Sequence, residues 1–166
     1  MKTLTRLAAV TLLLAATLTG CAQTVALTPA GDAQNSVCAD IVVHAPRDVL
    51  DLPYRETNAQ GVVAWGEPSA VILRCGVAIP DPTSTLPCVE VDGVYWLRDD
   101  AKAPNYVFTT YGRDPAVEVI VNRDRVAPGA ALLDLIPSVQ YAEEIGQCTE
   151  VEDTLGSPTP GPVPTD

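Results

Sequence analysis

The chain has very few residues of the kinds that usually bind metals or carry thiol chemistry. It contains one histidine, His44, and its five cysteines include no C-x-x-C pair. Zinc and thiol redox sites depend on such pairs or on clustered histidines, so both are disfavoured. The sequence also has no G-x-S-x-G motif, P-loop, dinucleotide-binding glycine motif or calcium loop. We therefore expect no metal and no cofactor, and a non-catalytic protein is favoured while the enzyme question stays open.

Basic residues are scarce as well. The chain has 10 Lys and Arg against 21 Asp and Glu, for a formal net charge of −11. Nucleic-acid binding needs clustered basic side chains that displace counterions from phosphates, so we expect no nucleic-acid partner. Anionic lipid headgroups would not attract such a surface either, so any membrane attachment must come from another source.

No apolar run is long enough to span a bilayer, which takes about 20 residues. The longest, Leu7 to Leu18, follows Lys2 and Arg6 and has the form of an export signal. It ends in Leu18-Thr19-Gly20-Cys21, which resembles the lipobox of bacterial lipoproteins. The resemblance implies a signal peptide over residues 1–20 and a lipid, such as diacylglycerol with palmitate, on Cys21. Two acyl chains anchor a protein stably, so the predicted location is the extracytoplasmic face of the cell membrane.

The other four cysteines, Cys38, Cys75, Cys88 and Cys148, are an even number in a chain predicted to be exported, which favours two disulfides. Four cysteines allow three pairings. Cys75 ends one predicted strand and Cys88 begins the next, and the other two lie at the ends of the domain. This layout favours Cys75–Cys88 with Cys38–Cys148.

Composition divides the mature chain into three parts. Residues 21–36 are small, polar residues with Pro and Gly, typical of a flexible tether that follows the lipid. Residues 37–148 are sufficient for a single core. Residues 149–166 alternate prolines with small or acidic residues and predict a disordered or polyproline-like tail.

Strand patterns dominate the domain. Val89 to Leu97 predicts a hairpin about Asp92-Gly93, and a second hairpin is expected about residues 113–115. Two further strands are predicted, over residues 39–45 and 69–77. Helical spacing of leucines predicts a helix from residue 128, which Pro137 interrupts before a second short helix through residue 143. A helical turn is expected at 46–50. The predicted fold class is α+β: an antiparallel sheet of about five strands, with one or two short helices on one face and two disulfides.

Three stretches, "AWGEPSAVILRCGV", "VDGVYWL" and "FTTYGRDPAVEV", resemble a family of small secreted or lipid-anchored actinobacterial proteins, domain of unknown function 3515. The segments Arg74–Val77 ("RCGV") and Thr109–Arg113 ("TTYGR") are the most distinctive. The resemblance implies the fold unit and the location, and it brings no activity and no catalytic residues.

Arginines beside aromatic residues are typical of surfaces that bind carboxylates or saccharides. Arg74 interrupts an otherwise apolar strand. The alternative for Arg74 is a structural ion pair with Glu56 or Glu67, with the aromatic residues in the core. The candidate ligand surface consists of Trp65, Arg74, Trp96, Arg98, Tyr111 and Arg113.

Three functions remain open. The favoured one is a lipid-anchored binding or interaction module that contacts an envelope protein or a cell-wall component. The second is a structural protein that presents its Pro-rich tail to a partner. The third is an envelope hydrolase that uses His44 or carboxylates such as Asp99 and Asp100, which requires that these groups converge in a cleft.

Overall fold

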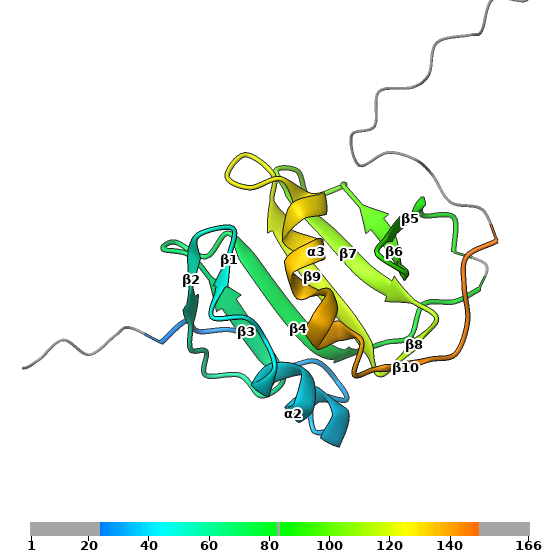
Figure 1. Cartoon of the computed structure of the whole chain (residues 1–166), viewed down its shortest axis with the longest axis horizontal. Coiled ribbons are helices and arrows are strands. Elements are labelled where there is room, and N and C mark those ends of the chain that lie inside the picture. Colours follow the sequence, from blue (N-terminus) through cyan, green and yellow to red (C-terminus); the bar gives the residue numbers. More distant parts are fainter. Residues whose placement is uncertain (1–23, 83, 150–166) are drawn as a thin grey trace, which may run out of the picture.

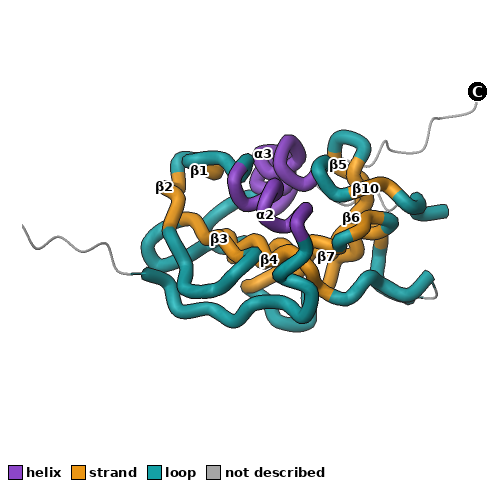
Figure 2. The backbone as a smooth tube through the Cα atoms, turned by 90° about the horizontal axis from the view of Figure 1, so that it is seen from below, coloured by secondary structure: helices purple, strands orange, loops and turns teal. Residues whose placement is uncertain are grey.

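The computed structural model describes residues 24–82 and 84–149 of the chain. An antiparallel sheet of eight strands forms one layer, and two helices pack together on one face of it (Figures 1 and 2). The sheet is thus larger than the five strands expected from the sequence. The helices are α2 (Ser36–Val43) and α3 (Pro128–Val139), and the strands are β1 (Asp48–Val49), β2 (Leu52–Arg55), β3 (Val62–Trp65), β4 (Val71–Val77), β5 (Cys88–Val91), β6 (Val94–Asp99), β7 (Asn105–Tyr111), β8 (Arg113–Asp114), β9 (Ala116–Asn122) and β10 (Glu143–Glu144).

The strand order explains how distant segments meet. The sheet runs β1-β2-β3-β4-β9-β7-β6-β5, and β8 pairs separately with β10. After β4 the chain crosses to the far edge, and β5, β6 and β7 lead back toward the centre, where β9 fills the place beside β4. The side chains of Val117, Val119 and Val121 on β9 are buried, and the intervening Glu118 is only half-buried. Alternate residues of a strand face opposite sides, so the valines face the core and Glu118 faces the other side of the sheet.

Both predicted hairpins are present. β5 pairs with β6 about Asp92 and Gly93, which have φ angles of 45° and 78°. Two successive positive φ angles are those of a type I′ turn, as the Asp-Gly pair predicts. β7 pairs with β9, and the connection between them supplies β8.

The segment predicted as a strand over residues 39–45 is not a strand, since residues 39–43 belong to helix α2 and the helix is capped at His44. The side chain of Asn35 caps this helix by accepting a hydrogen bond from the backbone N–H of Val37. Cys38 and Ile41, three residues apart, are fully buried. The β-branched residues of the segment favoured a strand in the sequence analysis. The N-cap and the burial of one helical face stabilise a helix instead.

The helical turn expected at residues 46–50 is also wrong, since Asp48 and Val49 form the strand β1. Leu50 and Asp51 then turn the chain with φ angles of 47° and 64°. The carboxylate of Asp134 on α3 holds this turn by accepting a hydrogen bond from the Leu50 N–H at 3.0 Å.

Helix α3 continues through Pro137 instead of dividing into two helices. Pro137 is exposed and follows the exposed Leu133 by four residues, so the carbonyl that loses its N–H donor can be hydrated. The Ser138 hydroxyl is buried and donates to the Leu135 carbonyl at 2.9 Å. The helix ends at Val139, before the predicted limit of residue 143.

The two disulfides are Cys38–Cys75 and Cys88–Cys148, which corrects the predicted pairing. β4 and β5 follow each other in the sequence, but three strands lie between them in the sheet. At about 4.8 Å per strand, Cys75 and Cys88 are roughly 19 Å apart, far beyond the reach of a disulfide. Cys38 instead reaches Cys75 from helix α2, with a Cα–Cα distance of 5.4 Å.

Residues 24–35, predicted as part of a flexible tether, lie along the domain. Val25 pairs with Thr57, the Asp32 N–H donates to the Gly76 carbonyl at 3.0 Å, and Ala33 is buried. The ordered region therefore starts before the predicted boundary at residue 37. The predicted leader with Cys21 and the tail from residue 150 onward lie outside the described residues.

Two glycines of the sheet region allow the segments before α2 and after α3 to approach closely. Gly76 has a φ of 84°, and a Cβ at this position would overlap the backbone of Asp32. Gly112 has a φ of 69°, and a Cβ there would overlap the backbone of Gly146. These glycines occur in "RCGV" and "TTYGR", so the two distinctive stretches are the places where the sheet contacts the N-terminal and C-terminal segments.

Candidate functional site: a pocket between α3 and strands β5 to β7

The six residues of the predicted ligand surface do not share one surface. Trp65 and Trp96 are fully buried in the core. The Trp65 Nε1 donates to the Pro46 carbonyl at 2.9 Å, which satisfies its one polar atom. Tyr111 lines a separate hollow of about 310 Å³ beside Cys148.

Two of the three arginines have structural roles. Arg74 pairs with Glu118 of the neighbouring strand at 2.8 Å, instead of the Glu56 or Glu67 considered from the sequence. Arg113 is 8% exposed. It donates to the Ala142 carbonyl at 3.0 Å and pairs with Glu144 at 3.2 Å, and so ties the segment after α3 to the sheet.

The groups considered for hydrolysis do not converge. His44 is exposed at the end of α2 and stacks on the Tyr141 ring at 4.3 Å. The Asp99 carboxylate accepts a hydrogen bond from the Ala101 N–H, and Asp100 lies 3.9 Å from Arg98. Among the described residues no group of three or more His, Cys, Asp or Glu side chains is placed to hold a metal ion.

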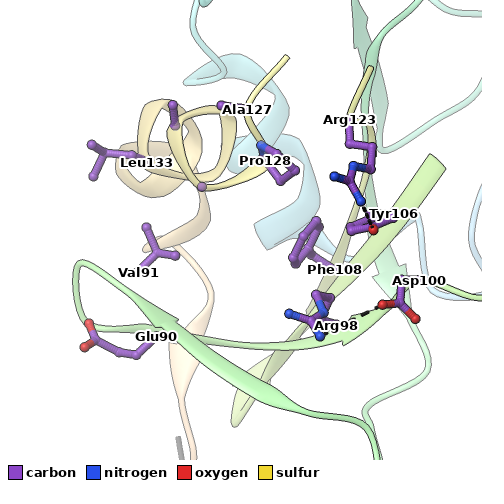
Figure 3. A pocket seen from close by; sticks show the side chains of 12 residues that line it. Glu90, Val91, Arg98, Asp100, Tyr106, Phe108, Arg123, Ala127, Pro128 and Leu133 are labelled. Atoms are coloured by element: carbon purple, nitrogen blue, oxygen red, sulfur yellow. Dashed lines mark hydrogen bonds and ion pairs between the residues drawn. The ribbon is translucent and has the colours of Figure 1, made fainter. Parts of the chain in front are cut away.

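Arg98 is the predicted site residue that lines a cavity of about 740 Å³ between α3 and strands β5 to β7. In Figure 3 one wall is a column of side chains from β6, β7 and the segment after β9: Arg98, Phe108, Tyr106 and Arg123. The first turns of α3 form the opposite wall. The whole cavity is lined by twelve residues: Glu90, Val91, Arg98, Asp100, Tyr106, Phe108, Arg123, Ala127, Pro128, Gly129, Ala130 and Leu133.

The sequence of α3 explains why a hollow forms here. Pro128 starts the helix, and it is followed by Gly129, which has no side chain, and Ala130, which has only a methyl group; both leave space over β6 and β7. One turn later Leu132 and Leu135 are fully buried and fill the space beneath the helix. The same helix thus closes the core with its second half and leaves a pocket at its first turn.

The charges of the pocket are arranged asymmetrically. Arg123 donates a hydrogen bond to the Tyr106 hydroxyl, and its guanidinium lies 5.1 Å from the centre of the Tyr106 ring. Arg98 and Arg123 lie on the same wall (Figure 3). The Glu90 carboxylate accepts a hydrogen bond from the Gly93 N–H in the hairpin turn and points away from Arg98 in this view. The wall formed by β6, β7 and Arg123 therefore carries two arginines and two aromatic rings, with the carboxylate of Asp100 beside Arg98.

The sequence interpretation identified one of these wall residues, Arg98, and missed Arg123, Tyr106 and Phe108. Phe108 and Tyr106 come from a strand whose position beside β6 depends on the strand order. Arg123 carried a weak signal, since it stands between the end of a predicted strand and Pro128 at the start of a predicted helix.

Fold and pocket together define the class: a disulfide-linked α+β domain with a cavity of the size that small ligands occupy. The chain belongs to the family described as "Protein of unknown function (DUF3515)", whose family model matches residues 3–144. Comparisons with curated proteins and with solved structures gave no match. In the part of the chain that the structure describes, no helix has the length and apolar character needed to cross a membrane.

Proposed function

We propose that this protein is a non-catalytic binding module of the cell envelope, held by lipid at Cys21 on the extracytoplasmic face of the membrane. The main support for this proposal is the pocket between α3 and strands β5 to β7. Its volume, about 740 Å³, is within the range of small-molecule sites, and it combines apolar walls with a few polar groups. The ligand would be a small molecule of the envelope or a part of a cell-wall component.

The hydrolase alternative has less support. Catalysis by His44 or by paired carboxylates needs these groups to face a substrate in a cleft. His44 lies on the outer surface of α2, and Asp99 is engaged with the backbone of its own loop. The alternative in which the Pro-rich tail recruits a partner concerns residues outside the described range.

Lipid attachment is tested by Cys21→Ala in the native host. Without the thiol that carries the lipid, the protein is expected in the medium or as an uncleaved precursor. Cell fractionation and electrophoretic migration measure both outcomes. A variant that fractionates and migrates like the parent would show that the lipid anchor is absent.

Ligand binding by the pocket is tested by filling it. Ala130 lines the cavity, so Ala130→Phe should occupy part of the space, while Ala101→Phe places the same ring on an exposed turn. Native mass spectrometry of protein purified from its own membranes should show a bound small molecule in the parent and in Ala101→Phe, and none in Ala130→Phe. Retention of the same molecule by Ala130→Phe would place binding elsewhere, and its absence from the parent would contradict the proposal.

A further inference from the structure

We propose that the pocket binds an amphipathic oxyanion, an alkyl carboxylate or an alkyl phosphate, with its charged end at the wall of Arg98 and Arg123. This inference rests on the proposed function, because it assumes that the cavity is a ligand site, and it names the ligand class. The apolar part of the ligand would lie between α3 and β5.

Of the two arginines, Arg123 is the better candidate for binding an anion. The chain has about twice as many acidic as basic residues, and Arg55, Arg74 and Arg113 each pair with a carboxylate. Arg123 forms no ion pair with any described residue. It is held by the neutral Tyr106, through the phenol hydroxyl and through the ring face. Its orientation toward the pocket is thus fixed without neutralising its charge, which favours an anion as the missing partner.

Arg98 supplies a second guanidinium on the same wall. Its side chain is 19% exposed and lies 3.9 Å from Asp100, which is longer than a hydrogen bond. Asp100 is 58% exposed, so water screens its attraction for Arg98. A ligand oxyanion at this wall would add a charge-assisted contact to those that Arg98 already makes.

Helix α3 adds partial positive charge from the opposite wall. Its first turn contains no acidic residue, and the N-cap position, Ala127, provides no side-chain cap. The backbone N–H groups of a first helical turn have no acceptor within the helix and attract anions. Gly129 and Ala130 line the cavity, so this end of the helix favours an anionic ligand together with the arginines.

The rest of the cavity is apolar and suits a hydrocarbon chain. Phe108 is fully buried in the wall between Arg98 and Tyr106, and Val91 and Ala127 also line the cavity. Leu133 is 51% exposed at the outer end and provides apolar surface beyond the pocket itself. A ligand with a charged head and an alkyl tail matches this arrangement, whereas a small inorganic anion would leave the apolar surface in contact with water.

The test uses the full chain with Cys21→Ser, which has no attached lipid, and three ten-carbon probes: decanoate, decyl phosphate and decanol. Titration calorimetry should show binding of at least one anion and at least tenfold weaker binding of decanol. Losing one charge-assisted hydrogen bond corresponds to about a tenfold change in affinity or more, so Arg123→Gln should weaken anion binding by about that factor. The comparison between the two anions distinguishes a carboxylate ligand from a phosphate ligand.

Arg125→Gln is the matched control, because Arg125 lies two residues away, donates to the Pro68 carbonyl and does not line the cavity. It should bind the anions like the parent, and thermal unfolding should confirm that both variants are folded. Equal binding of decanol and decanoate, or unchanged binding by Arg123→Gln, would overturn the inference. If decanol binding is then abolished by Ala130→Phe, the pocket remains a ligand site. If no probe binds the parent, the inference is wrong, whereas the proposed function still depends on the native mass spectrometry.

Discussion

Gly112→Ala is expected to be among the most damaging single-methyl additions in the fold. Gly112 has a φ of 69°, in the region where residues with a Cβ are strained. Its carbonyl accepts hydrogen bonds from the N–H groups of Ile145 at 2.8 Å and Gly146 at 3.3 Å. A Cβ on residue 112 would overlap the Gly146 backbone, so the segment after α3 must move away from the sheet.

The cost can be worked out from these contacts. The left-handed backbone costs about 1 kcal/mol for a residue with a side chain. Each of the two backbone hydrogen bonds contributes about 1 kcal/mol net, and displacement of the segment loses both. The free energy of unfolding should therefore fall by about 3 kcal/mol.

Two other glycines separate these terms. Gly93 has a φ of 78° with nothing near an added Cβ, so Gly93→Ala should cost only the strain, about 1 kcal/mol. Gly31 has open space and no positive φ, and Gly31→Ala should leave stability nearly unchanged. Urea denaturation of the oxidised full chain measures all three. If Gly112→Ala costs no more than Gly93→Ala, the close packing of the C-terminal segment against Gly112 does not contribute to stability, and the reasoning is refuted.

Three further predictions concern the same fold. Gly76→Ala should also be destabilising by more than its φ strain in urea denaturation, because Asp32 backbone blocks the added methyl; a cost near that of Gly93→Ala would contradict this. The Cys38–Cys75 disulfide spans 37 residues, so replacing both cysteines by alanine should remove about 4 kcal/mol, and non-reducing peptide mapping should find these two joined. Burial, and secondarily Glu56, raise the pKa of Tyr54 above 10.0, so the stability that this phenol contributes is full below pH 10 and is lost as the pH rises through the folded pKa. Glu56→Gln should lower that pKa in a phenolate absorbance titration, and an unchanged value would contradict the electrostatic part.

Local sequence patterns were sufficient to predict those elements whose structure depends on residues close together in the sequence. The Asp92-Gly93 hairpin, the strand at β4 and the start of α3 at Pro128 were all predicted, because turn chemistry and side-chain periodicity act over a few residues. The same reasoning failed at residues 39–45, where β-branched residues favour a strand in isolation. Burial of Cys38 and Ile41 against the sheet overrides that preference.

The site depended on strand order, which single-sequence patterns do not contain. Arg98 and Arg123 are 25 positions apart and come to lie on one wall because β7 lies between β6 and β9 in the sheet. The two tryptophans, predicted as candidates for a surface, fill the core, since a large aromatic side chain gains most from complete burial.

The sequence by itself determined the excess of acidic residues, the scarcity of metal ligands, the strand-rich domain and membership of its family. Each of these is a property of composition or of short segments, which the chain carries wherever it folds. Only the tertiary structure decided which cysteines pair and where a pocket opens. Both depend on the crossing from β4 to the far edge of the sheet, which separates Cys75 from Cys88 and brings β5 to β7 beneath the first turn of α3.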